Sequence, residues 1–136
     1  LNSPENREII LASIKPEDAK SHHEILRKIF VLEMDYRGQD GVLEYYENLY
    51  HCGLLLFPVC DPSDVEMMWK AKHINMDTGV GFDIETLFGA GFHATLDYLE
   101  GANKSDLRSE LSSLDEFISE DILKDWADFK RDYYYG

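Results

Sequence analysis

The sequence predicts an all-α fold, a compact single-domain bundle of about six helices that spans residues 1–136, with a glycine-rich loop in its middle. Apolar residues recur every three or four positions along most of the chain, which is typical of amphipathic helices. No segment of useful length alternates apolar and polar residues as a half-buried strand does. The chain of 136 residues is 44% hydrophobic and 12% aromatic, which suffices for one hydrophobic core.

Two helices are expected in the N-terminal part. Ser3 followed by Pro4 is a helix start, because a capping residue precedes a proline at the first helical position. The first helix should place Ile9, Ile10 and Ile14 on one face. Pro16 begins a second helix that ends at Arg37-Gly38 and keeps helical periodicity through its apolar residues, which are Ile25, Leu26, Ile29, Phe30 and Met34.

The middle of the chain predicts two more helices. One should run from near Asp40 to near Gly53, followed by a buried apolar run, 54–59, that fits either a helical turn or an extended piece. The next begins at Asp61-Pro62. Residues 73–91 hold four of the nine glycines and predict a loop with one short helix around 82–88. Three helices should follow: one over 92–99, one from Ser105 whose apolar stripe continues to Ile118, and one from Ser119. In the last of these helices, the residues that face inward should be Ile122, Leu123, Trp126, Phe129 and Tyr133.

Negative charge is the most unusual property of the sequence. The net charge is −14, and two tracts carry most of it: residues 33–66 hold eight acids and one base, and residues 105–128 hold eight acids and two bases. So many acids cannot pair with bases within their own helices. The charge repels nucleic acid and anionic membranes, so neither is an expected partner, and it attracts a basic protein.

Catalytic and cofactor motifs are weak. The stretch from Gly89 to Ala94 fits the glycine spacing of a dinucleotide fingerprint, but that motif requires a preceding strand, and a short helix is expected there. A small enzyme or ligand-binding domain centred on the 73–91 loop remains an alternative, with His73, Asp77, Asp83 and His93 as its candidate residues. Their spacing matches no zinc motif, so we expect no metal and no cofactor.

Two cysteines, Cys52 and Cys60, are too few for a disulfide framework and are expected to be reduced, although a bridge between them stays open. The longest uncharged apolar stretch, 51–60, is too short to cross a bilayer. The sequence does not open with the basic segment and apolar segment of a secretory signal peptide, so a cytoplasmic location is expected.

In its size, its acidic tracts and its lack of catalytic motifs, the chain resembles the immunity proteins of bacterial toxin systems. The resemblance implies an inhibitor, not an enzyme, that covers the active or substrate-binding surface of a basic, nuclease-like toxin. The carboxylates expected to face the lysines and arginines of such a partner are Glu44, Glu47, Asp61, Asp64, Asp121, Asp125 and Asp128. A helical scaffold or a homo-oligomer subunit is a further alternative, and the oligomeric state stays open.

Overall fold

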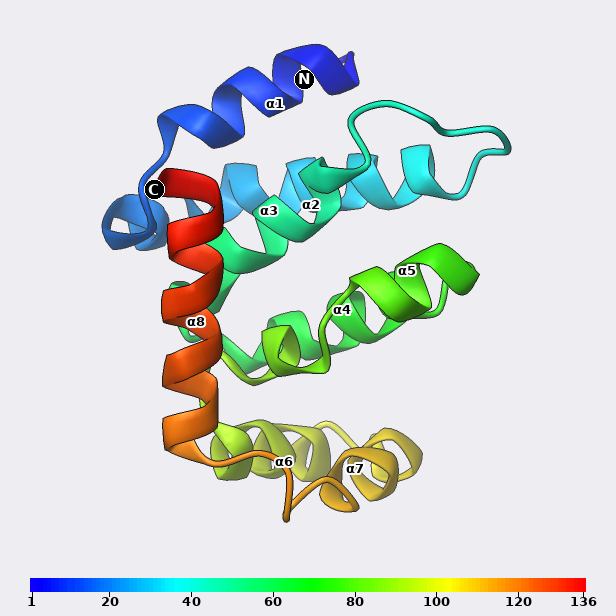
Figure 1. Ribbon diagram of the computed structural model, residues 1–136. Coiled ribbons are helices and arrows are strands. Elements are labelled where there is room, and N and C mark those ends of the chain that lie inside the picture. The colour runs from blue at the N-terminus through cyan, green and yellow to red at the C-terminus, as the bar shows by residue number, and fades with distance from the viewer.

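The computed structural model describes all residues, 1–136, and every regular element in it is a helix (Figure 1). The all-α prediction is therefore confirmed, with eight α-helices and four short 3-10 helices in place of about six helices. Their bounds are α1 (Pro4–Ser13), η1 (Pro16–His22), α2 (His23–Arg37), α3 (Glu47–Leu56), η2 (Phe57–Val59), η3 (Pro62–Asp64), α4 (Val65–Lys72), α5 (Met76–Gly81), η4 (Ile84–Phe88), α6 (Phe92–Gly101), α7 (Ser105–Ser112) and α8 (Glu120–Tyr135).

Most helices lie in three tiers, and α8 crosses these tiers at one side (Figure 1). The upper tier holds α1, α2 and α3, the middle tier holds α4, α5 and η4, and the lower tier holds α6 and α7. Upright α8 contacts α3 and η4, and its last turn reaches the N-terminal segment through the Tyr135 hydroxyl, which donates to the Ile14 carbonyl at 2.5 Å. The C-terminal helix thus joins elements that are far apart in the sequence.

One cluster of 23 buried residues forms the core, and it extends along the chain from Leu11 to Leu123. Its largest side chains include Phe30, Phe82 and Phe88. Phe30 on α2 packs edge-on against Phe82, with ring centroids 5.9 Å apart. The start signals at Ser3-Pro4 and Asp61-Pro62 are confirmed, because Ser3 caps α1 and Asp61 caps η3, which leads directly into α4.

The helix predicted from Asp40 begins later and ends later than expected. Residues 38–46 form a loop, in which Gly41 and Tyr45 have positive φ values of 73° and 56° that no α-helix accepts. The Arg37 guanidinium fixes this loop by donating to the Tyr46 carbonyl at 2.7 Å. At the other end α3 continues through Gly53 to Leu56, since the bare glycine lets the Phe82 ring and Thr86 approach the helix closely.

The glycine-rich loop is not confirmed, because residues 73–91 are mostly helical in the form of α5 and η4. Asn75 and Thr78 make a reciprocal capping box that starts α5. Lys72 ends it by donating from Nζ to the carbonyls of Gly79 at 2.7 Å and Phe82 at 2.6 Å. Polar caps therefore bound α5, and burial of Phe82, Leu87 and Phe88 in the core holds the second half of the segment.

The last two helices differ from the prediction in length and orientation. Helix α7 ends at Ser112, and turns follow it until Ser119 caps α8 by accepting a bond from the Ile122 amide at 3.1 Å. Five residues were expected to face inward on α8. Of these, Leu123 is buried and Trp126 is half-buried. The other three are exposed: Ile122, Phe129 and Tyr133.

Candidate protein-interaction surface

Two carboxylates of the first acidic tract are buried inside the protein. Glu33 is 0% exposed and pairs with Arg7, and Asp64 is 2% exposed. Asp64 lies 2.9 Å from Nε2 of His23 and 3.2 Å from Nε of Arg27. Burial raises the pKa of both carboxyls, against the opposing effect of their cationic neighbours. The expectation that Asp64 faces a partner is therefore wrong, because its carboxylate is buried and contacts His23 and Arg27.

The other three predicted carboxylates of this tract have different roles. Glu47 accepts the hydroxyl of Tyr134 at 2.6 Å and so anchors α8 to the start of α3. Asp61 accepts bonds from the side chain and the amide of Ser63, and these bonds lower its pKa. Only Glu44, in the 38–46 loop, is exposed with no partner for its carboxylate among the hydrogen bonds and ion pairs. Of the four carboxylates predicted in this tract to face a partner, only Glu44 is thus free to do so, and Asp35 and Asp40 of the same tract are exposed without an ion pair as well.

The second acidic tract lies on the surface. Asp121, Asp125 and Asp128 on α8 are exposed, and their spacing of four and three residues places them on one side of the helix. Asp132, which is exposed as well, extends this side by another four residues. We call these four residues the acidic row. Lys124, 2.6 Å from Asp128, makes the one ion pair in the row, so the other three carboxylates have no ion-pair partner.

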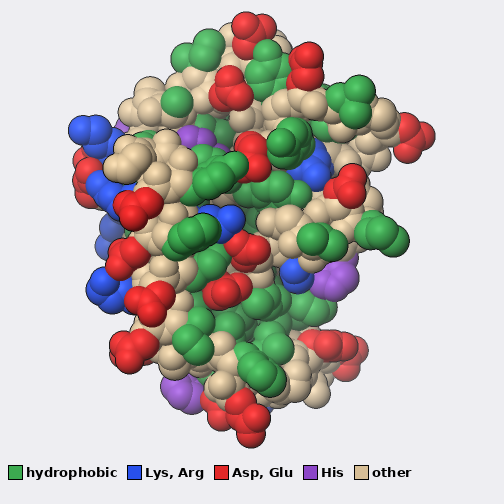
Figure 2. All heavy atoms as spheres, in the orientation of Figure 1, with side chains coloured by type: hydrophobic (Ala, Val, Ile, Leu, Met, Phe, Trp, Pro, Cys, Tyr) green, Lys and Arg blue, Asp and Glu red, His purple; other side chains and the backbone are tan.

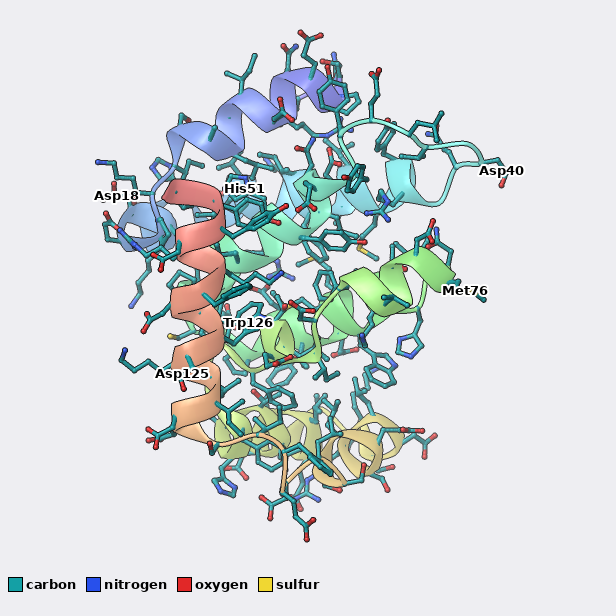
Figure 3. All side chains as sticks on the ribbon, in the orientation of Figure 1. Asp18, Asp40, His51, Met76, Asp125 and Trp126 are labelled. Atoms are coloured by element: carbon teal, nitrogen blue, oxygen red, sulfur yellow. The ribbon has the colours of Figure 1, made fainter.

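The inner side of α8 is held firmly, and this fixes the outward direction of the acidic row. The Trp126 ring packs against Phe57 with centroids 5.1 Å apart, and its Nε1 donates to Asp83 at 2.9 Å. Lys130 pairs with the same carboxylate at 3.1 Å. Figure 3 shows Trp126 pointing toward the body of the protein and Asp125 pointing away from it.

The space-filling view agrees with this orientation. In Figure 2, carboxylates follow one another down the left of the molecule, where α8 runs, with Lys and Arg side chains at the outer edge. Further carboxylates lie at the top, the right and the bottom of the same view. Negative charge is therefore not confined to α8. The distinguishing feature of α8 is that its aspartates lie in line along one side of the helix.

Next to the acidic row lies a second row that the sequence pattern misplaced. Ile122, Phe129 and Tyr133 are 40%, 66% and 61% exposed. Their spacing of seven and four residues places them on one side of α8, between the inner side and the acidic row. We call these three residues the apolar row. Helical periodicity indicated that they share a face, but it could not show that the core leaves this face uncovered.

The four candidate residues of the alternative site around residues 73–91 do not all come together, although His73 and Asp83 line one surface pocket of about 510 Å³. No three His, Cys, Asp or Glu side chains lie close enough together to hold a metal ion. His73 binds the Trp69 carbonyl through Nδ1 at 2.7 Å, Asp83 is used by Trp126 and Lys130, and His93 is exposed on α6. Asp77 is exposed on α5. The dinucleotide fingerprint fails as well, because η4 and not a strand precedes Gly89.

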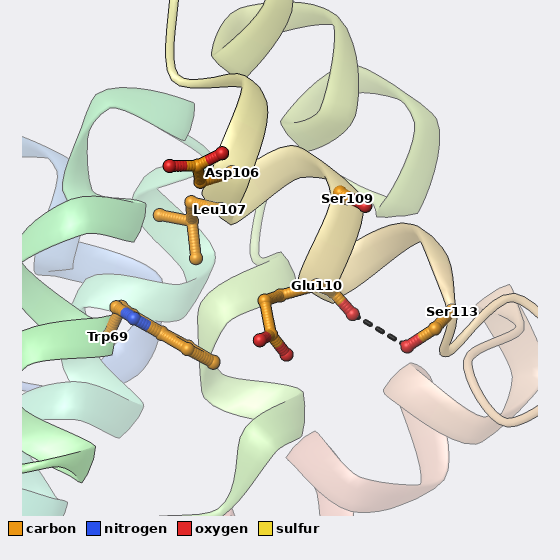
Figure 4. Close-up of a pocket in the computed structure, with 6 residues that line it drawn as sticks. All are labelled: Trp69, Asp106, Leu107, Ser109, Glu110 and Ser113. Atoms are coloured by element: carbon orange, nitrogen blue, oxygen red, sulfur yellow. Dashed lines mark hydrogen bonds between the residues drawn. The ribbon is translucent and has the colours of Figure 1, made fainter.

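The surface hollow drawn in Figure 4, of about 660 Å³, lies between Trp69 of α4 and the side of α7. Its lining consists of Trp69, Asp106, Leu107, Ser109, Glu110 and Ser113. The one side-chain hydrogen bond between these residues runs from the Ser113 hydroxyl to the Glu110 carbonyl at 2.7 Å. None of the residues singled out from the sequence lines this hollow.

No helix of the protein combines the length and the apolar character that crossing a membrane requires. Comparison of the chain with protein-family models, with curated proteins and with solved structures found no match.

Proposed function

We propose that the protein is a binding module for a basic protein, and that the acidic row of α8 forms the contact. The observation that carries this proposal is the register of Asp121, Asp125, Asp128 and Asp132 on the solvent side of a helix whose opposite side is fixed in the protein. Four carboxylates in line, three of them without an ion-pair partner, create a local negative potential, which attracts a cationic surface and orients it before contact.

The protein would inhibit its partner by covering the partner's active or substrate-binding surface. A basic toxin domain of the nuclease type holds lysines and arginines where its substrate phosphates bind, and a row of aspartates can occupy that surface in place of the substrate. This is the role of the immunity proteins that the chain resembles in size and charge. Within the first acidic tract, Glu47, Asp61 and Asp64 would contribute little, because they already bind groups within the protein.

The experiment compares two variants of equal net charge. The row variant replaces all four aspartates of the acidic row by asparagine. The control variant neutralises four exposed acids that lie elsewhere and take part in no ion pair, through the substitutions Glu8→Gln, Asp40→Asn, Asp97→Asn and Glu116→Gln. Each variant loses four of the −14 charges, so only position distinguishes them.

Both variants and the wild type are immobilised and used to capture proteins from an extract of the source cells, and a protein lost by the row variant alone is purified. Its association rate with the wild type should fall steeply as salt rises. At low salt the row variant should associate roughly 10-fold more slowly, and the control variant should stay close to the wild type. Equal rates for the two variants, or a rate that ignores salt, would refute the proposal.

A further inference from the structure

The apolar row is a surface that the fold leaves uncovered. Phe129 and Tyr133 expose more than half of their side chains although α8 already buries Leu123 on its inner side. From Ile122 to Tyr133 the row covers eleven helical steps, about 16 Å along the helix axis. Large apolar side chains that line up over three turns, rather than standing singly, mark an interaction site more often than an accident of composition.

Each residue of the apolar row has an aspartate of the acidic row as its neighbour in the chain. The pairs are Asp121 with Ile122, Asp128 with Phe129, and Asp132 with Tyr133. Successive residues of an α-helix are turned by about 100°, so the two rows run side by side along α8. A partner that covers the apolar row therefore meets a carboxylate beside each apolar contact.

This arrangement selects among the possible occupants. A second copy of the chain would bring its own four aspartates to the contact, and like charges side by side repel. An anionic lipid surface is repelled in the same way. A cationic segment instead neutralises the acidic row while its apolar residues cover Ile122 and Phe129.

The spacing also indicates the form of that segment. Contacts at intervals of seven and four residues on one helix fit the apolar ridge of a second helix, whose side chains recur every three or four residues. We propose that the basic partner presents a cationic amphipathic helix, which lies along α8 with its apolar ridge on the apolar row and its lysines or arginines on the acidic row. This inference rests on the proposed function and specifies the partner's secondary structure.

Two synthetic peptides of the same composition test it against the full-length protein. The patterned peptide has 18 residues with a leucine ridge beside a lysine ridge, and the shuffled peptide has the same leucines and lysines without helical periodicity. Affinities are measured by calorimetry. The apolar-row variant is Ile122→Ser with Phe129→Ser, and its control is Ile9→Ser with Leu43→Ser, which removes two apolar side chains that are 62% and 85% exposed elsewhere. Circular dichroism at 222 nm checks that both variants keep their helices.

The wild type should bind the patterned peptide at least 10-fold more tightly than the shuffled one. The apolar-row variant should lose that preference, its control should keep it, and the row variant with four asparagines should bind both peptides weakly. Unchanged binding by the apolar-row variant, together with weak binding by the row variant, would overturn the helix inference and leave the proposed function standing. Binding that ignores the asparagine substitutions would overturn both.

Discussion

The imidazole ring of His51 on α3 stacks on the phenol ring of Tyr134 on α8, with centroids 4.4 Å apart and planes only 5° from parallel. Nε2 of His51 also lies 2.7 Å from the hydroxyl of Tyr135. Because that hydroxyl donates to the Ile14 carbonyl, its oxygen can accept the Nε2 proton of a neutral histidine. The stack and the bond together attach the C-terminal half of α8, and thus half of the acidic row, to the body of the protein.

His51 should make the stability of the protein depend on pH. Burial lowers its pKa from 6.5 to about 4. Because the unfolded chain takes up the proton at higher pH, the neutral-His51 contribution is complete above about pH 6.5 and is lost as the pH falls toward 4. The full loss is on the order of 3 kcal/mol. The substitution His51→Phe keeps a ring for stacking and removes the titration.

Urea denaturation of the wild type and His51→Phe at pH 7, 6, 5 and 4 measures this effect. The difference in the free energy of unfolding should shift in favour of His51→Phe as the pH falls. Glu33 and Asp64 act in the opposite direction, since their raised pKa values favour the folded state in acid, but they are common to both proteins. If the free energies of unfolding of the two proteins changed in parallel with pH, His51 would not have the lowered pKa that its burial implies.

Local start signals explain which parts of the fold were predictable. Ser3, Asp61 and Ser119 each cap a helix by accepting a backbone amide, so the sequence chemistry and the structure coincide there. The 38–46 loop was unpredictable because its apolar residues imitate a helix face, while Leu43 is in fact 85% exposed. Its conformation is set by Arg37, which binds a carbonyl nine residues away.

The candidate surface was predictable only in part, because ion pairing in the first tract is tertiary. The side chains that pair with Glu33 and Asp64 are those of Arg7, His23 and Arg27, which lie 26 or more residues from their partners in the sequence. Counting acids and bases within a tract cannot find such pairs. The apolar row was missed for a related reason, since the contacts of Trp126 and Lys130 with Asp83 decide which side of α8 faces inward.

The pair of Arg7 and Glu33 should be costly to break and less costly to replace. Each single substitution, Arg7→Met or Glu33→Met, leaves an unpaired charge inside and should lower the free energy of unfolding by about 3–5 kcal/mol. The double substitution leaves no charge and should cost less than either one. Urea denaturation of all four proteins gives the coupling. A double variant that loses the sum of the two single effects would contradict this account.

Gly89 should not tolerate a side chain, because a Cβ there would overlap the backbone of Phe57, including its carbonyl oxygen. Gly89→Ala should therefore lower stability by about 1–3 kcal/mol. Gly101, the last residue of α6, is the matched control, since a Cβ there meets nothing within 4 Å. Gly101→Ala should be neutral or stabilising by up to about 1 kcal/mol. Thermal melts rank the two substitutions, and equal melting temperatures would argue against the close approach of η2 and Gly89.

The two cysteines are unpaired and should differ in reactivity. Cys60 is exposed, whereas Cys52 is buried and its burial raises the pKa of its thiol well above the usual range. A thiol reagent at pH 8 should label one cysteine in the folded protein, Cys60, and both in 8 M urea. Peptide mass mapping identifies the labelled position. Labelling of Cys52 at the same rate in the folded state would contradict its burial.

The acidic row should affect stability with opposite signs at its two ends. Asp121 lies in the first turn of α8, where the positive end of the helix dipole favours a carboxylate, and Asp132 lies in the last turn, where the negative end opposes one. Asp132→Asn should therefore raise the melting temperature, and Asp121→Asn should lower it, each by about 1–4 °C. Both should weaken binding of the basic partner. A carboxylate kept at the unfavourable end of a helix costs stability, and recognition of a cationic surface would offset that cost. If Asp132→Asn lowers the melting temperature instead, Asp132 stabilises the fold, and its place in the row needs no partner to explain it.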